Sequence, residues 1–166
     1  MQKLIQFSAR ELGVGYYMQA QIESAIQYVY GVDSQLVADE TYFVVEAKNR
    51  IVGCGGWSKR KTLFGGDQLK NSEDALLDPT IDSAKIRAFF VRPNWARRGV
   101  GSLILKRCFE EASACGFSAL ELMATLPGVP FYLSRGFFTV EETFLSLPNG
   151  VEVPLIRMSL ELLPID

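Results

Sequence analysis

The sequence predicts an α/β (mixed α+β) fold, a mixed sheet with helices on both faces, and two features of the chain indicate it. Its centre reads as strand, helix and strand, at the length of a right-handed βαβ unit with two parallel strands. Strand pairs joined by short turns stand before and after this unit. The 166 residues (1–166) fit a single domain with one core, and no repeat or linker divides them.

The N-terminal half predicts a strand, a helix and a pair of strands. We expect the first strand at residues 4–8 and a helix at 15–30, where apolar residues recur at three- and four-residue spacing. Residues 42–46 and 51–57 read as two strands around a turn. The polar connection at 58–84 is unusually long, which indicates a functional or loosely ordered loop.

The central βαβ unit begins with a strand at residues 86–91. After a short loop, Gly99-Val100-Gly101 opens a helix that runs to about Cys115, and the next strand occupies 117–123.

The C-terminal part predicts a short helix at residues 129–135 and then a hairpin. Its strands are 137–147 and 151–160, because Pro148-Asn149-Gly150 between them is typical of a tight turn.

Missing residue types exclude several kinds of site. The chain has no histidine, so histidine-dependent catalytic triads and histidine metal sites are excluded. The cysteines Cys54, Cys108 and Cys115 form no CxxC pair, and no metal is predicted. We expect Cys108 and Cys115 to be small core residues on one face of the predicted helix.

The charge and hydropathy of the chain argue against two kinds of partner. A net charge of −2 lacks the basic excess of a nucleic-acid-binding domain. No apolar run has the length of a signal peptide core or a membrane span, so we expect no membrane partner and a cytoplasmic protein.

Gly99-Val100-Gly101 predicts an anion-binding site. At a helix start the first N–H groups lack partners and the helix dipole favours negative charge. From Lys85 to Arg107 there are seven basic residues and no acidic one, in a chain that is acidic overall. This local excess indicates a ligand with more than one phosphate. The alternative is a turn that the glycines merely ease, flanked by solvated arginines.

Two other phosphate-binding motifs fit less well. A nucleoside triphosphate loop at residues 55–62 would have Arg60 in the place of its second glycine. A dinucleotide fingerprint would need glycine at Ile104, although Glu121 follows Gly101 by twenty residues, as a ribose-binding acid would. An NAD(P)-dependent oxidoreductase is therefore the second interpretation.

Two segments resemble the signatures of the GNAT superfamily of N-acyltransferases. Residues 89–102 resemble its acetyl-CoA motif, with a strand ending in Val-Arg-Pro and the loop Ala-Arg-Arg-Gly-Val-Gly. Residues 130–137, Pro-Phe-Tyr-Leu-Ser-Arg-Gly-Phe, resemble its second signature at a helix-to-strand junction. Their order and separation extend the resemblance over nearly the whole chain. It implies a GNAT-like fold with a central mixed, mostly antiparallel sheet of six or seven strands.

The resemblance also implies which residues bind acetyl-CoA. The backbone of Phe89 and Val91 would pair with the pantetheine arm like an added strand, with Phe90 between them. The pyrophosphate would lie on the loop formed by Arg97, Arg98, Gly99, Val100, Gly101 and Ser102. The sequence departs from the family pattern at Ala96, where Arg or Gln is usual, and Thr125 stands near the place of a common Asn.

The resemblance gives Tyr132 a catalytic role, because the matching tyrosine commonly protonates the departing CoA thiolate. This chemistry suits a chain without histidine, since a neutral amine attacks a thioester directly once both are positioned. The alternative role for Tyr132 is to pack the last helix onto the sheet.

The general base and the acceptor site are less defined. Glu121, on the C-terminal part of its strand, is the first candidate for the base if it faces the cleft. The alternative is an ordinary exposed strand carboxylate. The family pattern suggests that Tyr16-Tyr17, Trp57 and residues 64–67 lie near the acceptor. Of these, Trp57 and Asp67 would suit a cationic amine, although a Trp at a strand end is more often a core residue. The basic run at residues 59–61 would instead favour an acidic substrate, so the charges do not identify the acceptor.

The leading interpretation is an N-acetyltransferase that moves an acetyl group from acetyl-CoA to a primary amine of a small molecule or peptide. A non-catalytic acyl-CoA-binding sensor on the same fold is the third interpretation. Two exposed sheet edges would permit a homodimer.

Overall fold

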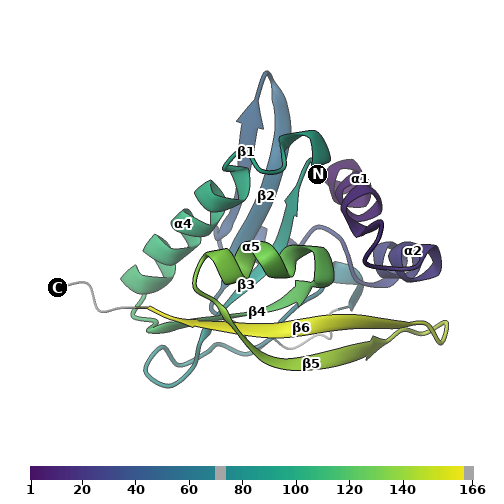
Figure 1. The fold of residues 1–166 in the computed structure, drawn as a ribbon. Coiled ribbons are helices and arrows are strands. Elements are labelled where there is room, and N and C mark those ends of the chain that lie inside the picture. The colour runs from purple at the N-terminus through teal and green to yellow at the C-terminus, as the bar shows by residue number, and fades with distance from the viewer. Residues whose placement is uncertain (70–73, 163–166) are drawn as a thin grey trace.

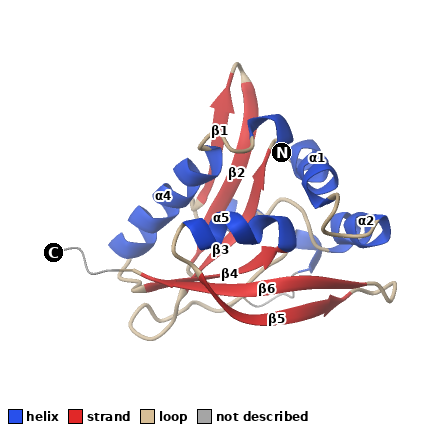
Figure 2. Ribbon diagram, in the orientation of Figure 1, coloured by secondary structure: helices blue, strands red, loops and turns tan. Residues whose placement is uncertain are grey.

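A six-stranded sheet runs through the molecule in the order β1-β2-β3-β4-β6-β5 (Figures 1 and 2). This computed structural model describes residues 1–69 and 74–162. Only β3 and β4 pair in parallel, and every other neighbouring pair in the described sheet is antiparallel. The strands are β1 (Tyr42–Ala47), β2 (Arg50–Ser58), β3 (Ala84–Val91), β4 (Ala119–Thr125), β5 (Phe138–Ser146) and β6 (Glu152–Glu161). The predicted mixed, mostly antiparallel sheet is confirmed.

Helices cover both faces of this sheet, as predicted (Figure 1). The first two pack on one face, where Leu4 and Ile5 contact Phe90, while Val100 and Ile104 belong to the core of the other face. The helices are α1 (Gln2–Gly13), α2 (Gln19–Tyr28), α3 (Ser34–Ala38), α4 (Val100–Ala114) and α5 (Val129–Ser134). Within the described ranges, no helix has both the length and the apolar character of a membrane span.

The strand predicted at residues 4–8 is wrong, because this segment belongs to α1. Leu4, Ile5 and Ser8 are buried whereas Phe7 is 42% exposed. Two adjacent buried residues followed by a third four positions later match one face of a helix and not the alternation of a strand. The short helix α3 was not predicted, and it begins where the Asp33 carboxylate accepts hydrogen bonds from two backbone N–H groups.

Glycines in β2 let α4 lie very close to the sheet. A Cβ atom at Gly53 would stand 2.4 Å from Cγ1 of Val100, and one at Gly55 would stand 2.5 Å from Cδ2 of Phe89. Side chains there would force α4 and Phe89 outward, so the glycines fix the position of the turn that opens α4.

The two parallel strands separate soon after they meet. The pairing of β3 with β4 consists of Ala84 with Leu120 and Lys85 with Glu121. From there β4 pairs with β6 to its last residue, Thr125. The part of β3 beyond Lys85 and the part of β4 beyond Glu121 therefore diverge and leave a gap in the sheet.

The structure tests the predictions for Cys108 and Cys115 and for the long connection after β2. Cys108 is buried as predicted, but Cys115 is exposed, because α4 ends one residue before it and the chain turns away at Gly116. In the connection after β2, the described residues hold a 3₁₀ turn at Asp67–Leu69 and an isolated bridge from Arg60 to Leu76. Residues 70–73 of that connection lie outside the described ranges.

Candidate active site

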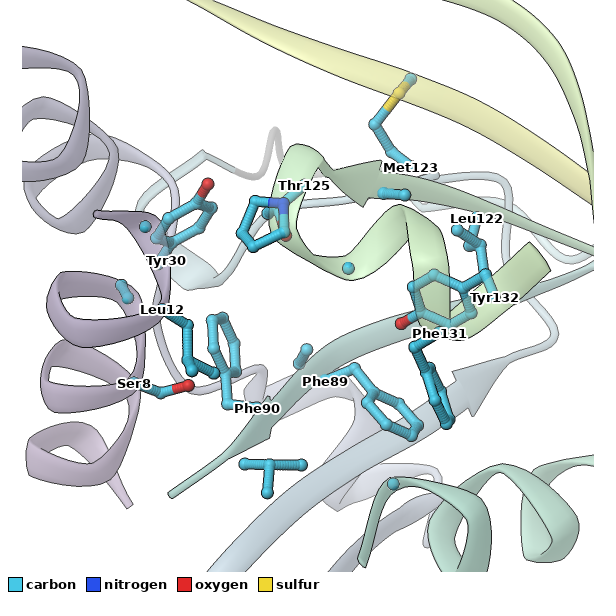
Figure 3. Close-up of a pocket in the computed structure, with 18 of the residues that line it drawn as sticks. Ser8, Leu12, Tyr30, Phe89, Phe90, Leu122, Met123, Thr125, Phe131 and Tyr132 are labelled. Carbon is cyan, nitrogen blue, oxygen red and sulfur yellow. The ribbon is translucent and has the colours of Figure 1, made fainter. Parts of the chain in front are cut away.

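The gap between β3 and β4 holds a cavity of about 830 Å³. All residues from Ile86 to Val91 of β3 and from Leu122 to Thr125 of β4 line it. In Figure 3, Phe89, Phe131 and Tyr132 border the space on one side, and Ser8, Leu12 and Tyr30 lie across it. The cavity thus lies where the sheet offers backbone that no neighbouring strand uses.

Phe89 and Val91 direct their backbone groups into this gap. The N–H of Arg92 donates to the carbonyl of Val52 on β2, at 2.8 Å. Because successive residues of a strand direct their backbone groups to opposite edges, Val91 and Phe89 present theirs on the β4 side. A β-bulge at Ala88, with φ of 52°, shifts the register with β2 just before Phe89. The side chain of Phe90 turns to the other face, 5.7 Å from the ring of Tyr30.

The turn before α4 forms the polar end of the cavity. Gly99 caps the helix with φ of 82°, and Arg97 also has a positive φ, 63°. Both line the cavity, as do Gly101 and Ser102 in the first turn of α4. A Cβ at Gly101 would stand 3.2 Å from Cζ of Phe131, so the glycine also allows α5 to pack close. Helix N–H groups without intrahelical partners and a Cβ-free surface make this end suitable for an anion.

Most of the basic residues in the segment from Lys85 to Arg107 serve other contacts. Four of them form salt bridges, namely Lys85, Arg87, Lys106 and Arg107. Arg98 stacks on Trp95 at 5.2 Å and faces a second hollow outside the cavity, and the side chain of Val100 is buried against β2. These two predicted residues can contribute only backbone groups to the cavity.

Arg135 provides a second cation at the polar end, although the sequence analysis gave this residue no role. Arg135 lines the cavity at the end of α5 and lies 5.7 Å over the ring of Phe131. With Arg97 it frames the start of α4. The sequence could have indicated Arg135 through its position within residues 130–137, the second family signature.

Tyr132 lies on α5 between the two ends of the cavity. Its ring is surrounded by Phe89, Phe131 and Phe137 at centroid distances of 5.2–6.2 Å. Burial and, to a smaller extent, the nearby Cys108 thiol raise the pKa of the Tyr132 hydroxyl above its ordinary value. The hydroxyl points toward the cavity in Figure 3, and it is therefore a protonated donor at neutral pH.

The other half of the lining, the apolar end, consists mainly of aromatic and aliphatic side chains. Tyr16-Tyr17, Phe64 and the two following glycines line it, as predicted for the acceptor region. Its further members are Leu12, Ile22, Tyr30, Val153 and Leu155.

Two residues proposed for that region lie elsewhere. Trp57 is 2% exposed, and its indole N–H donates to Glu111 on α4, so it is a core residue. Asp67 accepts hydrogen bonds from the backbone and hydroxyl of Ser34, outside the cavity lining.

Glu121 does not face the cavity, and the expectation that it is the general base is wrong. It is the third residue of β4, where β3 still pairs, and its carboxylate accepts hydrogen bonds from Lys85 and Arg157. Burial opposes ionisation of Glu121, but these two cations keep its pKa below the ordinary value. A carboxylate held in two ion pairs away from the cavity cannot take a proton from a ligand there.

Arg87 fixes the loop that borders the apolar end. Its side chain has no exposed surface, forms a 2.8 Å ion pair with Asp33 and donates to the carbonyl of Gly65 at 2.7 Å. A second carboxylate, that of Asp74, has its Oδ2 atom 3.6 Å from Nη1 of Arg87. Burial is the main cause that lowers the pKa of Arg87, and the carboxylates oppose it. The arginine thus ties β3, α3 and the loop after β2 together.

Solved structures with this fold cover nearly the whole chain. A GCN5-related N-acetyltransferase from Rhodopseudomonas palustris has a TM-score of 0.71 at 18% identity, over 97% of this chain and 87% of that one. YncA, a putative acetyltransferase from Salmonella typhimurium solved with acetyl-CoA, has a TM-score of 0.62 at 14% identity, over 99% and 88%. The PaiA N-acetyltransferase from Thermoplasma acidophilum, solved with coenzyme A, has a TM-score of 0.59 at 12% identity, over 96% and 89%.

A comparison with curated protein sequences gave no match. Residues 1–137, well over half of the chain, match the acetyltransferase (GNAT) family, and they include the β3–α4 turn and Tyr132. The protein therefore belongs to the GNAT family of acetyltransferases and is an acyltransferase.

Proposed function

We propose that this protein is an N-acetyltransferase that moves an acetyl group from acetyl-CoA to a primary amine, with Tyr132 as the general acid. The observation that carries the proposal is the gap between β3 and β4. On one side it presents the backbone of Phe89 and Val91, and at one end it has the N-terminal turn of α4. A pantetheine amide arm matches the first and a pyrophosphate matches the second.

Each part of the lining would have a separate role. The N–H groups at Gly99–Ser102 would bind the pyrophosphate, with Arg97 and Arg135 beside them. The β3 backbone would direct the thioester toward Tyr132. YncA and PaiA, whose structures contain acetyl-CoA and CoA, support this use of the fold.

The reaction balances with the groups available. The amine nitrogen attacks the thioester carbonyl as the free base, and the C–N bond forms. The nitrogen then loses a proton to water, the C–S bond breaks, and the thiolate takes the proton of the Tyr132 hydroxyl. The tyrosinate recovers a proton from solvent, so the products are the acetylated amine and CoA. The protein contributes the position of the reactants and one proton donor.

Two observations argue against the dinucleotide alternative. Ile104, which stands where the third glycine of that fingerprint belongs, is buried at 2% exposure under β2. Glu121, the only candidate for a ribose-binding acid, is held in ion pairs outside the cavity. The sensor alternative remains open to test, and a protonated tyrosine inside the cavity favours catalysis.

Calorimetric titration with acetyl-CoA, CoA and NADH tests the proposal, on the wild type and on Ser102→Asp. Ser102 lies in the first turn of α4, where an acidic residue favours the helix but repels a bound pyrophosphate. It is a cleaner test than Gly101→Glu, whose side chain would also press on Phe131. Ser118→Asp, the same exchange at an exposed position beyond the other end of α4, is the control.

We expect the wild type and Ser118→Asp to bind acetyl-CoA equally, and Ser102→Asp to bind it about tenfold or more weakly. NADH should not bind. A folded wild type that ignores acetyl-CoA would overturn the proposal, and binding of NADH instead would establish the alternative. Acetyl-CoA binding without turnover of any amine would favour the sensor.

A further inference from the structure

We propose that the acceptor is a small primary amine with an uncharged, apolar and preferably aromatic body, and not a polyamine or a peptide. This inference rests on the function proposed above and narrows its substrate class. Three properties of the apolar end carry it: its side chains, its charge and the hydrogen bonds between the chain segments beside it.

The side chains of the apolar end suit a ring. Tyr16, Tyr17, Tyr30, Phe64 and Phe90 all line it, from α1–α2, the loop after β2 and β3. Aliphatic side chains line it as well, namely Leu12, Ile22, Val153 and Leu155, beside the uncharged polar side chains of Ser8 and Gln21. An aromatic amine placed here would contact ring edges and faces on several sides, which an extended polar chain would not.

The charge of the lining opposes a polycation. Among the described residues that line the cavity, none is Asp or Glu, and the charged ones are Arg87, Arg97 and Arg135. The buried Arg87 already holds Asp33, so neither charge of that pair is offered to a ligand. A second ammonium group would enter this end without an anionic partner, and an isolated charge is costly to bury. A single amine that enters as the free base avoids this cost.

Hydrogen bonds join the α1–α2 region to the β5–β6 hairpin beside the apolar end. The Tyr17 hydroxyl donates to the carbonyl of Pro154 at 2.7 Å, and Gln21 Nε2 donates to the carbonyl of Glu152 at 2.9 Å. Asn149 Nδ2 donates to Ser24 Oγ at 2.9 Å. A peptide that entered between these segments would have to break these hydrogen bonds, so a small acceptor is favoured over an extended one on this side of the cavity.

The test measures release of CoA from acetyl-CoA with three amines: 2-phenylethylamine, spermidine and a hexapeptide with N-terminal alanine and one lysine. We expect kcat/KM for 2-phenylethylamine to exceed that of the other two by about 100-fold or more. A higher kcat/KM for spermidine or the peptide would overturn the inference.

A substitution in the wall separates the acceptor class from the acetyl-CoA proposal. Tyr16→Ala removes a ring that is half exposed, so the fold should tolerate it. We expect it to raise KM for 2-phenylethylamine about tenfold and leave the acetyl-CoA Kd unchanged. Phe144→Ala, which removes an exposed ring outside the cavity lining, should change neither.

The outcomes distinguish the two proposals. If calorimetry detects acetyl-CoA binding but 2-phenylethylamine is inert, the acceptor class is wrong and the cofactor proposal stands. If acetyl-CoA does not bind at all, the proposed function itself fails. An unchanged KM in Tyr16→Ala would show that the aromatic side chains of the apolar end do not bind the acceptor, and it would overturn the preference for a ring.

Discussion

Lys85 and Glu121 form the last residue pair that joins β3 to β4, and their side chains make a 2.5 Å ion pair at that position. Immediately beyond it the two strands diverge around the cavity. Arg157 on β6 binds the other carboxylate oxygen of Glu121, so three adjacent strands are joined at the closed end of the gap. This cluster holds the three strands together beside the gap, and none of its side chains lines the cavity.

Loss of the Glu121 charge should destabilise the protein. Glu121→Gln leaves Lys85, whose side chain is 11% exposed, without its anionic partner. Breaking a buried pair in this way costs about 3 kcal/mol or more in free energy of unfolding, measured by urea denaturation at pH 7. Glu141→Gln, which removes an exposed partner of Arg157, should cost less than about 1 kcal/mol. Equal effects of the two variants would contradict this assignment.

The same cluster should make the free energy of unfolding depend on pH in the acidic range. Because the cations hold the pKa of Glu121 below its ordinary value, the ion pairs contribute fully above about pH 4.3 and are lost as pH falls through the lowered pKa. We expect the stability difference between wild type and Glu121→Gln to shrink below pH 4, as followed by urea denaturation across pH. A constant difference down to pH 2 would rule out this linkage.

Tyr132→Phe should remove the proton donor and keep the packing. The rings of Phe89, Phe131 and Phe137 around it would still be contacted by a phenylalanine. We expect kcat to fall about 100-fold while the acetyl-CoA Kd stays within about threefold, from steady-state rates and calorimetry. Tyr28→Phe, outside the cavity lining, is the control. A kcat equal to the wild type would show that Tyr132 only packs α5.

The pH profile of catalysis should lack an alkaline limb from Tyr132. Burial raises the pKa of this hydroxyl above about 10, so it stays protonated while the amine loses its proton. We expect kcat/KM to rise with pH and to level off, with no decrease up to pH 10. A decrease between pH 8 and 10, in an enzyme shown to remain folded, would mean that the acid is another group.

Loss of the hydroxyl should change the free energy of unfolding differently at two tyrosines of the apolar end. The Tyr17 hydroxyl has two partners, because it donates to Pro154 and accepts from the N–H of Leu126. The Tyr30 hydroxyl is buried and has no hydrogen-bond partner among the described residues. Tyr17→Phe should lower the free energy of unfolding by about 1–3 kcal/mol, and Tyr30→Phe should leave it equal or higher. Urea denaturation of both variants, side by side, decides this.

The centre of the fold could be predicted because its signals are local. Pro93 stops a strand, a glycine pair opens a helix, and α4 lies within one residue of its predicted end. Local periodicity failed at α1, since a short segment such as residues 4–8, with three apolar and two polar residues, is compatible with either a strand or a helix face. The burial of Leu4, Ile5 and Ser8 together, which only the tertiary structure reveals, decides for the helix.

The site was predictable where motifs describe backbone, and less so where side chains pair across the chain. Phe89, Val91, Gly99 and Gly101 all line the cavity, and their contact with acetyl-CoA stays a prediction. The seven-residue basic excess overstated the site, because four of these residues form salt bridges. Lys106 and Arg107 pair with carboxylates four positions later on α4, whereas Lys85 and Arg87 pair with residues distant in sequence. No spacing rule in one sequence identifies the two distant partners.

Cys115 gives this protein a convenient attachment point. Of the three free thiols, Cys54 and Cys108 are buried, and Cys115 alone is exposed. It follows the last residue of the 15-residue helix α4, about 24 Å along the helix from the turn at Gly99. A maleimide dye would therefore react at one position, far enough from that turn not to obstruct a ligand there. The same thiol would also add a background of one equivalent per chain to any assay that detects free CoA with a thiol reagent, so Cys115→Ser is the better parent for kinetics.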